Sequence, residues 1–72
     1  AAAEELRHAV RFDPRYSAAW KLLGKALLAM EDRAGAADAW THGIEVARER
    51  GDKQAEKEMT VFLRRIEPKD AS

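Results

Sequence analysis

The chain of 72 residues contains no cysteine, which excludes disulfide bonds, zinc–thiolate sites and thiol nucleophiles. It also lacks an excess of charge of either sign, because 13 basic residues are balanced by 13 acidic ones. Proteins that bind nucleic acids or membrane surfaces usually carry a basic excess, so this balance argues against both functions. Long hydrophobic runs are missing too, since charged residues interrupt the chain far more often than the roughly 20 apolar residues of a membrane span would allow.

Proline and glycine are scarce, at two and four residues, and their positions divide the chain into segments. Asp13-Pro14 ends the first segment, because proline lacks an amide hydrogen and disfavours a helical residue before it. Gly51-Asp52 combines a left-handed helix C-cap with an N-cap for the next helix. Pro68 closes the last segment.

Within these segments the apolar residues recur every three to four positions, and no comparable stretch alternates with the period of two that strands require. Alanine, leucine, lysine, glutamate and arginine, all good helix formers, dominate the composition. The sequence therefore predicts an all-α fold of four helices. The four apolar stripes are Ala2, Leu6, Ala9 and Val10; Trp20, Leu23, Leu27 and Met30; Ala36, Trp40, Ile44 and Ala47; and Ala55, Met59, Phe62, Leu63 and Ile66.

The first predicted helix matches the third when the sequence is shifted by 34 residues. Leu6 then falls on Trp40 and Val10 on Ile44. A helical hairpin repeat that is cut open near its middle produces this pattern.

One stretch resembles the tetratricopeptide repeat (TPR) pattern W-x2-L-G-x2-Y…A-x3-F…P. It reads Trp20-Lys-Leu-Leu23-Gly24-Lys-Ala-Leu27 and is followed by Ala36-x-x-x-Trp40. The resemblance implies antiparallel helical hairpins of an α-solenoid. Residues 1–14 would be the second half of one repeat and residues 17–50 one full repeat.

The sequence departs from the TPR pattern at several positions. Leu27 stands at the tyrosine position, Glu31 at the turn glycine, Gly43 at the second-helix alanine and Arg48 at the closing proline. The lost proline predicts that the third helix continues toward Gly51. Beyond that glycine the repeat pattern is lost, so residues 52–67 are expected to form a capping helix that completes a single domain, 1–67. Residues 68–72 would be a polar tail.

The TPR resemblance also predicts the core. Trp20 and Trp40 would lie on facing helix surfaces and supply the largest buried areas, while Gly24 and Ala36 are small because the helices cross closely. The predicted core residues are Trp20, Leu23, Gly24, Leu27, Ala36, Trp40, Ile44, Met59 and Phe62.

No catalytic or metal-binding constellation is recognisable. Ser17 is interpreted as an N-cap, and neither Gly-x-Ser-x-Gly nor His-Glu-x-x-His occurs. His8 and His42 are two imidazoles, whereas a structural zinc site normally has four protein ligands. The basic pair Arg64-Arg65 lacks the interleaved aromatic residues typical of nucleic-acid binding. We therefore expect no enzyme activity, no cofactor, no metal, no nucleic-acid partner and no membrane partner.

Charge is distributed unevenly along the chain. Residues 17–30 carry Lys21 and Lys25 and no acid, whereas residues 31–50 carry three basic and five acidic side chains. In TPR arrays the first helix of each hairpin lines a groove for extended peptides, so the resemblance implies a groove for a protein or peptide partner. The two lysines would meet an acidic group there, or else serve only for solubility. The implied groove residues are Ala18, Lys21, Leu22, Lys25, Leu28 and Ala29.

The open end of the array suggests a different function. About three repeats are needed to bury a continuous core, and this chain has one and a half plus a cap. Leu6, Val10 and Phe12 are therefore expected to expose apolar surface, either because the chain comes from a longer array or because two copies pair as a homodimer. The hypotheses are thus a peptide-binding interaction module and a structural homo-oligomer without a ligand. The sequence does not reveal the compartment, for which cytoplasmic is only a default.

Overall fold

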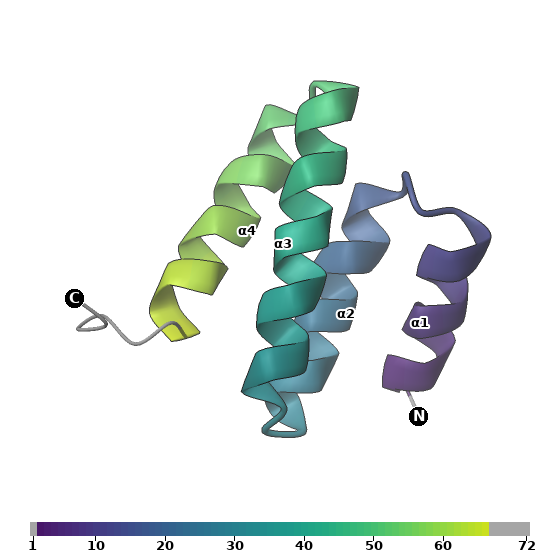
Figure 1. Cartoon of the computed structure of the whole chain (residues 1–72), viewed down its shortest axis with the longest axis vertical. Coiled ribbons are helices and arrows are strands. Elements are labelled where there is room, and N and C mark those ends of the chain that lie inside the picture. The colour runs from purple at the N-terminus through teal and green to yellow at the C-terminus, as the bar shows by residue number, and fades with distance from the viewer. Residues whose placement is uncertain (1, 67–72) are drawn as a thin grey trace.

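The computed structural model describes residues 2–66, which form four α-helices and no strand. These are α1 (Ala2–Phe12), α2 (Ser17–Ala29), α3 (Arg33–Arg50) and α4 (Lys53–Ile66). Helices α2 and α3 pack together as an antiparallel hairpin, and α1 and α4 lie on opposite sides of it (Figure 1). The prediction of an all-α fold with four helices is confirmed. The predicted domain end at Glu67 and the tail 68–72 lie outside the described residues.

Two helix boundaries follow from local capping chemistry. Gly51 ends α3 with a φ of 74°, a left-handed conformation that costs glycine little because it has no Cβ. The Asp52 carboxylate then accepts a hydrogen bond from the Ala55 amide at 3.2 Å and so caps α4. As expected from the missing proline at Arg48, α3 continues to Arg50.

The start of α2 differs from the expectation. Its N-cap is Tyr16, whose side chain makes no capping hydrogen bond, and Ser17 is already inside the helix. The Ser17 hydroxyl donates instead to Asp52 Oδ2 at 3.1 Å, which joins the start of α2 to the start of α4. The interpretation of Ser17 as an N-cap was therefore wrong, because a carboxylate distant in sequence lies within reach of its hydroxyl.

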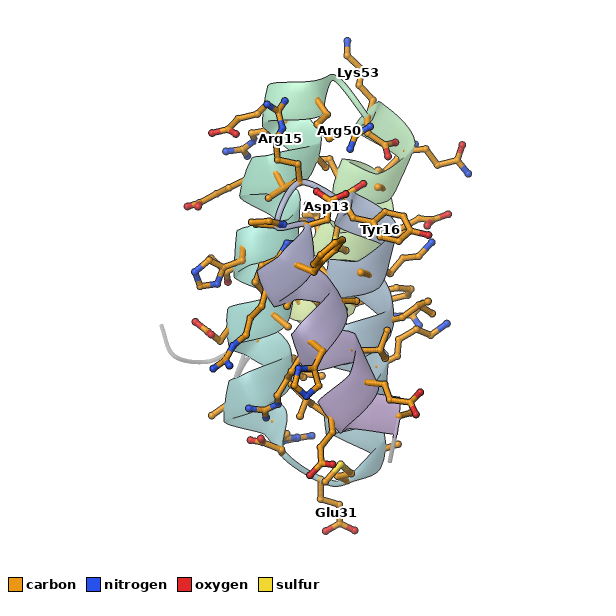
Figure 2. The ribbon with its side chains drawn as sticks, turned by 90° about the vertical axis from the view of Figure 1, so that its right-hand side faces the viewer. Asp13, Arg15, Tyr16, Glu31, Arg50 and Lys53 are labelled. Atoms are coloured by element: carbon orange, nitrogen blue, oxygen red, sulfur yellow. The ribbon has the colours of Figure 1, made fainter. Side chains whose placement is uncertain are left out.

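Two backbone carbonyls of the turn between α1 and α2 accept hydrogen bonds from side chains of α3 and α2. The Arg50 guanidinium of α3 donates to the Arg15 carbonyl at 2.6 Å, and the Trp20 indole N–H donates to the Pro14 carbonyl at 2.8 Å. Figure 2 shows Arg15 and Arg50 close together at one end of the molecule, with Glu31 at the opposite end in the α2–α3 turn. Glu31 has a φ of 63°, the conformation for which the TPR pattern uses glycine.

The core lies where α3 meets α2 and α4. Trp40 and Met59 are the largest fully buried side chains, at 1% and 0% exposure. A Cβ on Gly24 would overlap the Trp40 indole, and a Cβ on Gly43 would overlap Met59 Sδ and lie 2.8 Å from the Trp20 Cβ. The two glycines therefore allow α3 to approach its neighbours closely. Leu23, Leu27, Ala36 and Ile44, four residues of the expected core, are buried as well.

Two predicted core residues are only half-buried, and both are aromatic. Trp20 stacks on His42 with ring centroids 5.1 Å apart, but its side chain also borders an open cleft between α1 and α3. Phe62 packs on Trp40 with ring centroids 5.3 Å apart, while Lys25 lies over the Phe62 ring. Both rings sit at helix–helix seams, so they extend the core to the surface rather than lying inside it.

The expectation of three exposed apolar residues on α1 was wrong for Val10. Val10 is 6% exposed, because it lies with Ala3 on the face of α1 that packs against α2. Leu6 is half-buried, and Phe12 is 92% exposed. Phe12 alone of these three presents its whole side chain to solvent. No helix in residues 2–66 combines the length and apolar character needed to cross a bilayer.

Candidate functional site

The candidate site lies along the seam between α2 and α4 and consists of two cavities. The first, of about 250 Å³, is called the polar cavity and is lined by Ala18, Lys21, Asp52, Gln54, Ala55 and Glu58. The second, of about 210 Å³, is called the apolar cavity and is lined by Lys25, Leu28, Trp40, Phe62, Arg65 and Ile66. Four predicted groove residues thus border these cavities, whereas Leu22 and Ala29 are exposed and border neither.

An ion pair crosses the polar cavity. Lys21 Nζ lies 2.7 Å from Glu58 Oε1, so the ammonium of α2 is already paired with a carboxylate of α4. The hydrogen bond from Lys21, together with one from Gln54, lowers the pKa of the half-buried Glu58 carboxyl below its usual value. A partner's carboxylate would have to displace Glu58 before it could reach Lys21. The pair itself adds little stability, because both side chains remain in contact with solvent, which screens their charges.

The apolar cavity has an aromatic floor and two cationic residues at its rim. Trp40 and Phe62 form the floor, and the Trp40 indole N–H is already satisfied by the Lys21 carbonyl at 3.1 Å. Lys25 Nζ lies 5.6 Å from the Phe62 ring centroid, within the range of a cation–π interaction. Within residues 2–66, Lys25 and Arg65 form no salt bridge with an acidic residue. This cavity therefore offers apolar surface inside and positive charge at its edge.

Their i, i+4 spacing places Lys21 and Lys25 on one face of α2, but it does not reveal the residues of α4 that meet them. Glu58, Phe62 and Ile66 are spaced four apart, so they share one face of α4. The sequence signal that could have indicated these residues was the spacing of four between Glu58 and Phe62, which puts an acid on the same face as the apolar stripe. Arg65 was interpreted only as part of a basic pair, and nothing local to it indicates a cavity.

The histidines lie away from this seam and are exposed. His42 packs on Trp20, and its Nδ1 lies 3.0 Å from the Asp38 carbonyl oxygen. Across the described part of the chain, no group of three or more histidine, aspartate or glutamate side chains is arranged to hold a metal ion.

Comparisons with known proteins identify the family. No protein-family model matches the chain. A TPR repeat-containing protein from Pseudomonas aeruginosa is 61% identical over 66 residues, which cover 92% of this chain and 63% of that protein. The chain belongs to the tetratricopeptide repeat family.

Two further proteins resemble this TPR chain. A heat-shock protein cognate co-chaperone from Aspergillus fumigatus is 38% identical over 66 residues, covering 92% of the chain and 19% of that protein. The solution structure of a Bordetella parapertussis protein superposes with a TM-score of 0.76 and 57% sequence identity, covering 85% of the TPR chain and 53% of the other. The chain therefore spans only part of each of these relatives.

Membership of the TPR family accounts for the close packing described above. The small residues Gly24 and Ala36 and the large ring of Trp40 are the signature positions, and they meet where α2 crosses α3. The division into a half repeat (1–14), a full repeat (17–50) and a cap (52–67) stays a prediction.

Proposed function

We propose that this TPR chain is a non-catalytic protein-interaction module that receives a segment of a partner protein along the α2–α4 seam. The observation that carries the proposal is the presence of two cavities in line along one helix seam. Peptide-binding surfaces need concave sites with an apolar interior and a few placed charges, and this seam has both. The Aspergillus fumigatus relative is named a co-chaperone, which is consistent with a protein partner.

The absence of catalysis is supported by how the buried polar groups are used. Within residues 2–66, Ser17 is the one buried polar residue, and its hydroxyl donates to Asp52. Asp52 in turn caps α4 through the Ala55 amide. A hydroxyl activated for catalysis needs an adjacent general base, whereas this carboxylate is engaged in holding two helix starts together.

Site-specific photo-crosslinking tests the proposal. A benzophenone amino acid is placed at Leu22 or Ala29, which are exposed on α2 beside the seam, and at Glu45 on the exposed surface of α3 as a control. We expect a partner from the source cell to crosslink to the α2 positions and not to Glu45. Equal crosslinking at all three positions, or crosslinking only at Glu45, would contradict the proposal.

A second candidate function is homodimerisation through α1. Phe12 is 92% exposed and Leu6 half-buried on a helix at the edge of the molecule (Figure 1). Sedimentation equilibrium at tens of micromolar, compared with a Phe12→Ser variant, measures this directly. A mass of two chains that falls to one in the variant supports the dimer, and a mass of one chain for the parent protein rejects it.

A further inference from the structure

The apolar cavity admits a side chain and, apart from the two cations at its rim, lines it with carbon surface. Leu28, Phe62 and Ile66 contribute carbon surface, and the one indole N–H nearby is already donated to the Lys21 carbonyl. A polar group inserted below this rim would lose its hydrogen bonds to water without replacement, so the side chain that enters the cavity must be apolar. The volume of about 210 Å³ suits a single large side chain, since an apolar cavity of about 150 Å³ already holds benzene.

The rim of the apolar cavity selects for negative charge. Lys25 from α2 and Arg65 from α4 are both exposed, and among residues 2–66 no acidic side chain lines the cavity. The Phe62 ring holds the Lys25 ammonium near the opening through a cation–π contact. The Arg65 guanidinium can bind a carboxylate with two parallel hydrogen bonds. An acidic residue beside the inserted apolar side chain would therefore meet a cation at the rim.

The polar cavity has the opposite character, although it also contains a lysine. Asp52 and Glu58 both line it, and Glu58 already neutralises Lys21. A carboxylate that arrived there would face two carboxylates of the chain itself. Lys21 and Lys25 are thus unequal, even though the sequence places both on one face of α2.

We propose that the apolar cavity is the specificity pocket of this module and binds a protein segment with a leucine, methionine or phenylalanine flanked by acidic residues. Lys25 and Arg65 recognise the flanking carboxylates, and Lys21 takes no part in recognition because it is paired with Glu58. This inference rests on the proposed function, and it names the chemistry of the partner.

The test uses 15N-labelled protein and the blocked peptide acetyl-Asp-Glu-Leu-Asp-Glu-amide, which has no terminal carboxylate. In one control peptide alanine replaces the leucine. In the other, asparagine and glutamine replace the four acidic residues. In 1H–15N NMR spectra we expect the first peptide to shift the resonances of the Trp40 indole N–H and the Phe62 amide. It should also bind at least about tenfold more tightly than either control peptide. Binding should also weaken as salt is added, because exposed charges are screened.

Charge variants distinguish the roles of Lys25 and Arg65 from that of Lys21. Lys25→Glu and Arg65→Glu should each weaken binding about tenfold. Lys57→Glu and Arg64→Glu change the net charge equally at exposed positions that do not line this cavity, and they should leave affinity unchanged. Lys21→Gln should also leave it unchanged. Equal binding of the amide peptide, an effect of Lys21→Gln matching that of Lys25→Glu, or shifts confined to the Glu58 region would each overturn the proposal.

Two other occupants of the cavity would also overturn it. Nuclear Overhauser contacts between Phe62 and the chain after Ile66 would mean that the protein's own segment fills the cavity. Chemical shifts of Phe62 that depend on protein concentration without peptide would mean that a second copy does. If crosslinking from α2 captures a partner but the peptide does not bind, the proposed function stands and only this inference fails.

Discussion

Replacement of Gly24 by alanine tests whether close packing against Trp40 holds the hairpin together. By helix propensity alone the variant should be more stable, because alanine is favoured over glycine inside a helix by about 1 kcal/mol. The tertiary structure predicts the opposite. A Cβ at this position would overlap the Trp40 indole, and Trp40 has little freedom to move because it is 1% exposed and donates to the Lys21 carbonyl at 3.1 Å.

The expected magnitude follows from two opposing effects. Overpacking a well-filled core costs about 1–3 kcal/mol, and a strained or broken indole hydrogen bond adds about 1 kcal/mol. After subtraction of the propensity gain, we expect Gly24→Ala to lower the free energy of unfolding by about 1–3 kcal/mol. This is a large share of the roughly 5 kcal/mol available to a small domain.

Urea unfolding followed by far-ultraviolet circular dichroism measures the effect. With a slope of about 1 kcal/mol per molar urea for a small domain, the midpoint should fall by about 1–3 M. The double variant with Trp40→Phe provides the control, because the smaller ring leaves room for the new methyl group. The cost of Gly24→Ala should therefore shrink in that background, a coupling that a double-mutant cycle detects. A midpoint for Gly24→Ala equal to or above that of the parent protein would refute the packing argument.

Three further predictions concern the turn, the ion pair and the core. Glu31→Gly should raise the free energy of unfolding by about 1 kcal/mol in the same urea assay, because Glu31 has a φ of 63° and a left-handed conformation costs a residue with a Cβ. The lowered pKa of Glu58 means that its pairing stabilises the fold above the unfolded-state pKa and is lost as pH falls through the folded-state value. The small stability difference between the parent protein and Lys21→Gln should therefore be present at neutral pH and vanish in acid, whereas a difference that persisted in acid would argue against the pair. Met59→Ala should cost about 2–5 kcal/mol, because Met59 is fully buried between α3 and α4, and thermal unfolding would show whether that value is reached.

Most of the helical architecture could be predicted, because helix ends depend on nearby residues. Gly51-Asp52 ended one helix and began the next as expected, and the missing proline at Arg48 let α3 continue. The start of α2 could not be predicted. Ser17 has the chemistry of a local cap, but its hydroxyl donates to Asp52, which is 35 residues away. Local rules fail when a tertiary partner competes for the same group.

The candidate site was only half predictable for a related reason. The i, i+4 spacing places Lys21 and Lys25 on one face of α2, and the structure shows that this face borders α4. Which acid or ring faces each lysine depends on how α4 crosses α2. Glu58 pairs with Lys21, and the Phe62 ring lies beneath the Lys25 ammonium. Both partners lie more than 30 positions further along the chain than the lysine they meet.

The sequence by itself determined the four helices and most of their ends, because capping and apolar periodicity act over a few residues, and its motif resembles that of the TPR family. Tertiary structure alone decided that Trp40 is buried while Trp20 remains half-exposed, although both occupy apolar stripes. It also decided that Lys21 is paired while Lys25 borders an apolar cavity. The physical reason is that periodicity shows which residues share a helix face, whereas the distance and crossing of neighbouring helices set what that face meets.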